Sequence, residues 1–98
     1  KIMLTHIVCW KYQPETTEVQ RTEHINRLRD LVNHIPNIIS LNVGTDVLHL
    51  DRSYNTGLVA VFPDRDALDV YTAHPAHQEV VAIGRAIAAH VVSVDFVE

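Results

Sequence analysis

The first third of the chain contains two different patterns of hydrophobic residues. They first fall on alternating faces with a period of two, and then recur with the period of a helix. Residues 4–12 are mostly apolar, β-branched or aromatic, which predicts a β-strand whose side chains alternate between two faces. From Thr17 to Ile35 apolar residues recur every three or four positions, which predicts an amphipathic helix. Thr17 and Gln20 have the spacing of a capping box at its start, and Pro36 marks its end.

The rest of the chain predicts three more strands and two helices. We expect strands over residues 38–47, 54–62 and 91–97, and helices from Asp64 to about His74 and from Pro75 or Ala76 to about Ala89. Pro75 separates the helices because the residue before a proline avoids helical dihedral angles. The order β-α-β-β-α-α-β predicts an α+β fold, a ferredoxin-like four-stranded antiparallel sheet with helices on one face. A chain of 98 residues is expected to form one domain, residues 1–98.

Several predicted strands are apolar on both faces. Leu58, Ala60 and Phe62 fall on one side of the third strand, and Val59 and Val61 fall on the other. Helices on one face alone would leave the second apolar face in water, which is unusual for a monomer. A second copy of the chain is therefore expected to cover it, giving a homodimer joined sheet to sheet.

Charge and cysteine content narrow the partners and the compartment. Eight Lys and Arg against twelve Asp and Glu give a net charge of −4, which argues against nucleic acid and anionic membrane surfaces as partners. The single Cys9 cannot form an intramolecular disulfide, and no apolar run is long enough for a transmembrane helix. A cytoplasmic location is expected.

The strongest chemical signal is the segment from Tyr71 to His77. It places a phenol and two imidazoles, those of His74 and His77, at the forced helix break. A phenol can donate to a developing oxyanion and an imidazole can take a proton near neutral pH, so the set suits carbonyl chemistry, with His6 on the first strand as a third member. A purely structural alternative stays open, in which Tyr71 packs by its ring, His74 caps a helix and His77 bonds a carbonyl.

Other catalytic templates are missing from the sequence. It contains no HExxH or CxxC metal motif and no Gly-rich phosphate loop. We therefore expect neither a metal nor a cofactor.

The chain resembles the stress-responsive dimeric α/β-barrel domain family over nearly its whole length. The residues that carry the resemblance are His6-Ile7-Val8, Pro14-Glu15-Thr16-Thr17, Ile35-Pro36, Ser53-Tyr54, the run from Asp69-Val70-Tyr71 to His74-Pro75-Ala76-His77, and Val94-Asp95-Phe96. The resemblance implies ferredoxin-like protomers that pair through their sheets as a dimeric α/β barrel.

The same resemblance implies roles for individual residues. By similarity to a plant polyketide cyclase of the family, His77 would be a general base that removes a proton between two carbonyls, Tyr71 would hold the oxygen that gains charge, and His6 would line the pocket. Ligand-binding residues are expected on the same side of the sheet, on the first helix and at the helix break: Val8, Trp10, His24, Ile25, Leu28, Thr56, Leu58, Ala60 and His74. The chain departs from the cyclase at Thr56, His24 and Trp10, and Trp10 is large enough to fill the cavity.

Two functions follow as expectations. The first is a dimeric protein of the stress-responsive family that binds an apolar small molecule in a cavity lined by His and Tyr, without catalysis. The second is a cyclase-like lyase in which His77 is the base and Tyr71 the oxyanion donor. Related dimeric barrels that oxidise quinol-like substrates without a cofactor form a third class, for which the sequence offers no discriminating residue.

Overall fold

The computed structural model describes residues 2–98 and contains four strands, three α-helices and one 3-10 turn. In chain order they are β1 (Leu4–Tyr12), α1 (Glu18–Asp30), η1 (Leu31–Asn33), β2 (Ser40–Thr45), β3 (Thr56–Phe62), α2 (Arg65–Ala73), α3 (Pro75–Ile87) and β4 (Ala88–Val97). The expected order of elements is confirmed, and every boundary except the end of α1 lies within three residues of the expected one.

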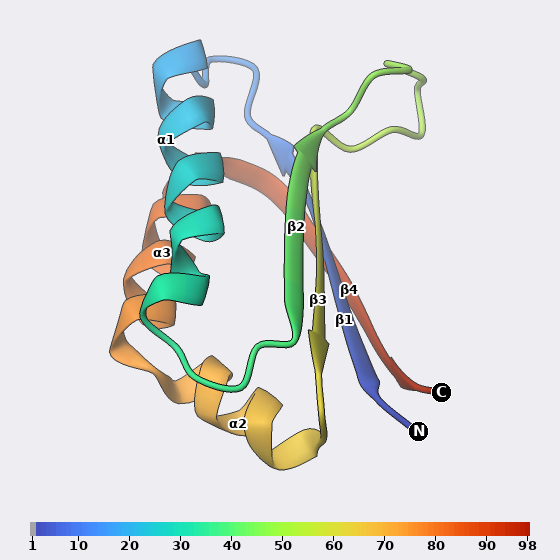
Figure 1. Cartoon of the computed structure of the whole chain (residues 1–98). Coiled ribbons are helices and arrows are strands. Elements are labelled where there is room, and N and C mark those ends of the chain that lie inside the picture. Colours follow the sequence, from blue (N-terminus) through green and yellow to red (C-terminus); the bar gives the residue numbers. More distant parts are fainter. Residues whose placement is uncertain (1) are drawn as a thin grey trace.

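The four strands form one antiparallel sheet in the order β2-β3-β1-β4. Figure 1 shows α1 and α3 side by side against one face of this sheet, with α2 at one end and the opposite face bare. The two outer strands are second and last in the sequence, which is the ferredoxin-like arrangement. The expected fold class is thus confirmed.

Helix α1 begins as expected and ends early. The hydroxyl of Thr17 accepts a hydrogen bond from the amide of Gln20 at 3.2 Å, and the Gln20 side chain accepts one from the amide of Thr17 at 2.8 Å. The predicted helix to Ile35 instead becomes a 3-10 turn after Asp30. The tighter turn changes the helical period, so Val32 is 46% exposed although the pattern had assigned it to the buried stripe.

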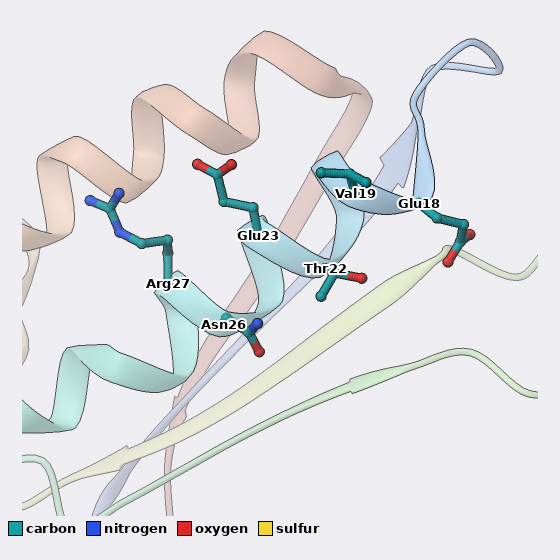
Figure 2. Close-up of a pocket in the computed structure, with 6 residues that line it drawn as sticks. All are labelled: Glu18, Val19, Thr22, Glu23, Asn26 and Arg27. Carbon is teal, nitrogen blue, oxygen red and sulfur yellow. The ribbon is translucent and has the colours of Figure 1, made fainter.

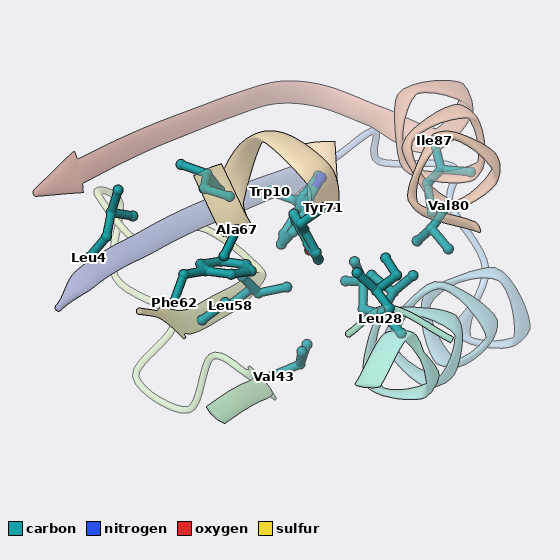
Figure 3. Close-up of a cluster of buried hydrophobic side chains, with 14 of the residues drawn as sticks. Leu4, Trp10, Leu28, Val43, Leu58, Phe62, Ala67, Tyr71, Val80 and Ile87 are labelled. Atoms are coloured by element: carbon teal, nitrogen blue, oxygen red, sulfur yellow. The ribbon is translucent and has the colours of Figure 1, made fainter. Parts of the chain in front are cut away.

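Strand pairing fixes which side chains face the helices. His6 pairs with Ala60, Val8 with Leu58, and Trp10 with Thr56, so the expected shared face is confirmed. Side chains on this face meet apolar residues of the helices in one core, as Figure 3 shows. The labelled members of that core come from all three helices and from β1, β2 and β3.

The outer face of the sheet remains apolar and uncovered. Val59, Val92, Val94 and Phe96 are 40, 48, 54 and 41% exposed. The register places these side chains around Ile7 on the face away from the helices. A patch built from three adjacent strands is the feature that the two-sided strands predicted.

Gly84 allows α3 to approach β1 and α1 closely. A methyl group on residue 84 would lie 2.7 Å from Nε2 of His24 and 3.3 Å from Nε1 of Trp10. The His24 and Trp10 rings pack edge to face with centroids 5.0 Å apart. The absence of a side chain at position 84 therefore makes room for two buried rings.

Replacing Gly84 by Ala should destabilise the protein, although Ala is the better helix former. The added methyl must displace two packed rings, so we expect the free energy of unfolding to fall by about 1–3 kcal/mol. Gly44→Ala is the matched control, because its Cβ would meet nothing within 4 Å. Chemical denaturation measures both. An unchanged or raised stability of Gly84→Ala would contradict this packing.

Candidate functional site

The break between α2 and α3 positions the two groups expected to do chemistry. His74 takes an extended conformation, with φ −64° and ψ 135°, and serves both as the C-cap of α2 and as the N-cap of α3. Its Nδ1 accepts a hydrogen bond from the amide of Ala76 at 3.0 Å. Tyr71 consequently lies in the last turn of α2, and His77 in the first turn of α3.

A cavity of about 320 Å³ lies where this break meets the sheet. Its walls come from β1, β3, β4 and all three helices, and its lining residues are His6, Val8, Trp10, Leu28, Leu58, Tyr71, Thr72, His77, Val80, Val81, Arg85, Val91 and Ser93. The volume falls at the small end of the roughly 300–1,000 Å³ typical of ligand sites. Tyr71, His77 and His6 therefore share one ligand-sized space.

Tyr71 is buried among aromatic rings but keeps a free hydroxyl. Its ring centroid lies 5.0 Å from that of Phe62, 4.3 Å from that of His77 and 6.0 Å from that of His6. Across residues 2–98 its hydroxyl has no hydrogen-bond partner, and it is not among the fully buried atoms. Burial raises the pKa of Tyr71 to about 12, so the phenol remains a donor at physiological pH.

The surroundings of His77 leave one ring nitrogen available as a base. Its Nδ1 lies 3.1 Å from the carbonyl oxygen of Thr72, which can only accept, so Nδ1 carries the hydrogen. In the neutral ring Nε2 then holds the lone pair. Burial is the main cause that lowers the pKa of His77, and the neighbouring His6 and His74 lower it further, against the raising effect of the Thr72 carbonyl. His77 is thus held in the neutral form that a base requires.

His6 is paired with a carboxylate that the sequence analysis did not assign to the site. Nδ1 of His6 lies 2.5 Å from Oδ1 of Asp95 on the neighbouring strand β4. A carboxylate in this position orients the ring and leaves Nε2 as the second free nitrogen at the cavity. Strand register was the available signal, since Asp95 is the direct cross-strand partner of His6.

Four of the residues expected to bind a ligand belong to the apolar wall of this cavity. Val8, Trp10, Leu28 and Leu58 line the cavity, and Trp10 narrows it without filling it. The expectation lacked the walls supplied by α3 and β4, namely Val80, Val81, Arg85, Val91 and Ser93, together with Thr72. Positions 91 and 93 pair with Trp10 and Val8, so strand parity could have found them.

Five expected ligand-binding residues lie elsewhere. His24, Ile25, Thr56, Ala60 and His74 do not line this cavity. His74 is occupied by its helix cap, and Ala60 is fully buried in the core. Ile25 and Thr56 line a separate, smaller cavity of about 120 Å³ beside Tyr12.

His24 belongs to a buried chain of hydrogen bonds behind Trp10. The hydroxyl of Thr56 donates to that of Tyr12 at 2.9 Å, and the Tyr12 hydroxyl lies 2.7 Å from Nδ1 of His24. His24 is 1% exposed, and its Nε2 has no partner within residues 2–98. Burial lowers the pKa of His24 to about 4, so the ring is neutral and structural.

The outer face of α1 carries a depression that we do not regard as a site. Its lining residues are Glu18, Val19, Thr22, Glu23, Asn26 and Arg27 (Figure 2). All six belong to one helix, so no second element closes the space over a ligand. In the described part of the chain, no group of three or more His, Cys, Asp or Glu is placed to hold a metal ion, and no helix is long and apolar enough to cross a bilayer.

The topology and the cavity together define a ferredoxin-like protein with a ligand-sized space between sheet and helices. The model of the stress responsive A/B barrel domain family matches residues 4–98. The chain therefore belongs to this family.

Comparison with individual proteins gives one relative in sequence and many in structure. Olivetolic acid cyclase from Cannabis sativa is 30% identical over 74 residues, covering 74% of this chain and 73% of the cyclase. A dimeric ferredoxin-like protein of unknown function from Thermobifida fusca superposes with a TM-score of 0.88 at 26% identity, covering 97% of this chain and 90% of that one. Hydroxynitrile lyase from Passiflora edulis also superposes with a TM-score of 0.88, at 18% identity, covering 98% of this chain and 93% of the lyase. This likeness shows the shared fold alone.

The buried neutral His24 should make stability depend on pH. Its pKa is lower in the folded state than the 6.5 of an unperturbed His, so protons favour the unfolded chain, and stability present above about pH 6.5 is lost as the pH falls toward 4. We expect His24 to account for a loss of roughly 2 kcal/mol between about pH 8 and pH 5. Urea denaturation at both pH values measures it.

His24→Asn should flatten this pH dependence, because Asn does not titrate while its side-chain oxygen can still accept from Tyr12. His49→Asn is the control, since the His49 side chain is 78% exposed. Equal slopes in the wild type and His24→Asn would assign the acid sensitivity to other groups.

Proposed function

We propose that this protein binds a small, largely apolar carbonyl compound and catalyses proton transfer on it, with His77 as the base and Tyr71 as the oxyanion donor. The convergence of Tyr71, His77 and His6 on one apolar cavity carries the proposal. The free Tyr71 hydroxyl and the free Nε2 of His77 are the donor and acceptor that such chemistry needs.

The reaction class follows from these two groups. Nε2 of His77 takes a proton from a carbon next to a carbonyl, and the C–H electron pair forms an enolate. The enolate carbon attacks a second carbonyl, a C–C bond forms, and the π pair of that carbonyl moves onto its oxygen. Tyr71 donates a hydrogen bond to this oxygen, which then takes up the proton from His77. His6, oriented by Asp95, binds a polar group of the substrate beside them.

The sequence relative supports this class, since it is a cyclase by name. The apolar walls formed by Val8, Leu58 and Val80 favour a substrate whose body is a hydrocarbon chain or ring.

His77→Gln should lower kcat by about 10² to 10⁴ with the fold unchanged, because a positioned base is removed. Tyr71→Phe should cost about 10² to 10³, the usual effect of losing one oxyanion donor. A suitable assay is the cyclisation of a linear β-polyketide thioester, followed by product absorbance. The lowered pKa of His77 predicts that kcat/KM falls only at a pH below the usual His range, as the base becomes protonated.

His34→Gln serves as the matched control, since His34 pairs with Asp30 on the surface and does not line the cavity. Full activity in His77→Gln would remove His77 from the mechanism. Full activity in Tyr71→Phe would do the same for the oxyanion role.

Binding without turnover is the second candidate, and specific contacts favour it. The Tyr71 ring packs against Phe62, His74 caps α3, and His77 bonds the carbonyl of Thr72. Each group thus also has a structural role. On this account His77→Gln lowers the melting temperature, and the wild type does not turn over the polyketide thioester.

We also infer that two copies pair through the bare face of the sheet. The apolar patch of Val59, Val92, Val94 and Phe96 needs an apolar cover, and an identical patch provides one through a two-fold axis. Structural neighbours described as dimeric support the inference. Such pairing leaves the cavity, on the other face, accessible.

Val94→Asp should shift the protein from dimer to monomer at micromolar concentration, because it buries a charge in the apolar contact. Sedimentation equilibrium measures the change. Val19→Asp is the matched control, since Val19 is 77% exposed on the opposite side of the molecule. A wild-type monomer at this concentration, or a Val94→Asp dimer of unchanged stability, would contradict pairing through this face.

A further inference from the structure

Arg85 is an unpaired cation at the wall of the cavity. Several other arginines have partners: Arg27 pairs with Glu79, Arg65 with Asp69, and Arg29 donates to the carbonyl of Val43. Within residues 2–98, Arg85 forms neither a salt bridge nor a side-chain hydrogen bond. A molecule of net charge −4 therefore places an unpaired, solvent-exposed arginine at the wall of the space that holds its candidate catalytic groups.

The cavity has a long axis with different chemistry at its two ends. On α3, the lining residues His77, Val81 and Arg85 occur on successive turns, so His77 and Arg85 are about 12 Å apart along the helix. On β1, His6 and Trp10 are separated by about 13 Å along the strand. The two pairs run in parallel, because Gly84, next to Arg85, is the residue that approaches Trp10. The polar cluster thus marks one end, and Arg85 with Trp10 marks the other.

Between the ends the walls are mostly apolar. Val8, Leu58, Val80 and Val81 line this middle part, where Ser93, the cross-strand partner of Val8, adds one hydroxyl. Val91 pairs with Trp10 and lies at the Arg85 end. No carboxylate is among the lining residues, since Asp95 stands behind His6. A ligand that satisfies every part of this cavity has a carbonyl at one end, a hydrocarbon middle and an anion at the other end.

The geometry points to Arg85 as the binding group for the carboxylate of an elongated oxo acid whose carbonyl lies at Tyr71 and His77. The guanidinium offers two parallel donors to a carboxylate, a pairing that a neutral substrate cannot make. Trp10 lines the same end of the cavity, beside Gly84. This inference rests on the proposed function, because it assumes that the cavity binds a carbonyl compound.

Isothermal titration calorimetry with 7-oxooctanoate and its neutral counterpart 2-octanone tests it. The wild type should bind the oxo acid about tenfold more tightly, the usual effect of a hydrogen bond to a charged group. Added salt should weaken the binding of the oxo acid and leave the binding of 2-octanone unchanged. In Arg85→Gln the tenfold preference should disappear while the affinity for 2-octanone stays unchanged, which also shows that the cavity is intact. Arg85→Lys should keep part of the preference.

Arg52→Gln is the matched control, since Arg52 lies in the loop between β2 and β3 and does not line the cavity. A preference that survives in Arg85→Gln, or is equally lost in Arg52→Gln, would overturn the role of Arg85. Binding of 2-octanone without any preference for the oxo acid would overturn it too and leave the proposed function standing. Failure of both ligands to bind the wild type would contradict the proposed function and this inference together.

Discussion

The site depends on one backbone constraint, the exclusion of helical dihedral angles at the residue before Pro75. Tyr71 and His77 are six positions apart, so on one unbroken helix they would point roughly 120° away from each other. The extended conformation of His74 turns α3 away from α2, and the two rings come within 4.3 Å between centroids. The cap that His74 provides to α3 offsets part of the cost of breaking the helix, because it satisfies an amide that would otherwise lack a partner. The conformation that Pro75 imposes on His74 therefore brings the candidate donor Tyr71 and the candidate base His77 together.

Local patterns were sufficient for the frame of the molecule and for the face on which each strand residue lies. The capping box at Thr17, the break at Pro75 and the shared face of His6, Val8 and Trp10 on β1 all follow from rules that act over a few residues. The 3-10 turn after Asp30 was missed because its residues have an acceptable helical pattern, and tertiary packing chose the tighter turn. The pairing of His6 with Asp95 was missed because the two residues are 89 positions apart in the sequence and meet only when β1 and β4 pair.

His24 and His77 are both neutral imidazoles on the inner side of the sheet, but they have different surroundings. His24 lies against Trp10 of the sheet, and Tyr12 holds its Nδ1, yet it does not line the cavity. The same residue type therefore serves two purposes in this chain. At His24 the neutral ring fills space beside Gly84, and at His77 the neutral ring borders an open volume. What separates them is whether the free nitrogen meets protein or cavity, and this depends on packing that no local pattern encodes.

The two faces of the sheet have different surroundings. The outer face is apolar and exposed, which suits pairing of copies, while the inner face carries the cavity under its helices. Strand β4 joins the two, because Val91, Ser93 and Asp95 face inward and Val92, Val94 and Phe96 face outward. Since β4 lies at the edge of the sheet, with no strand beyond it, its position is less constrained than that of the central strand β1. A partner bound to its outer side would restrict its movement, and with it the placement of Asp95 against His6. Association of two copies would in this way help to hold the polar end of each cavity in its working geometry.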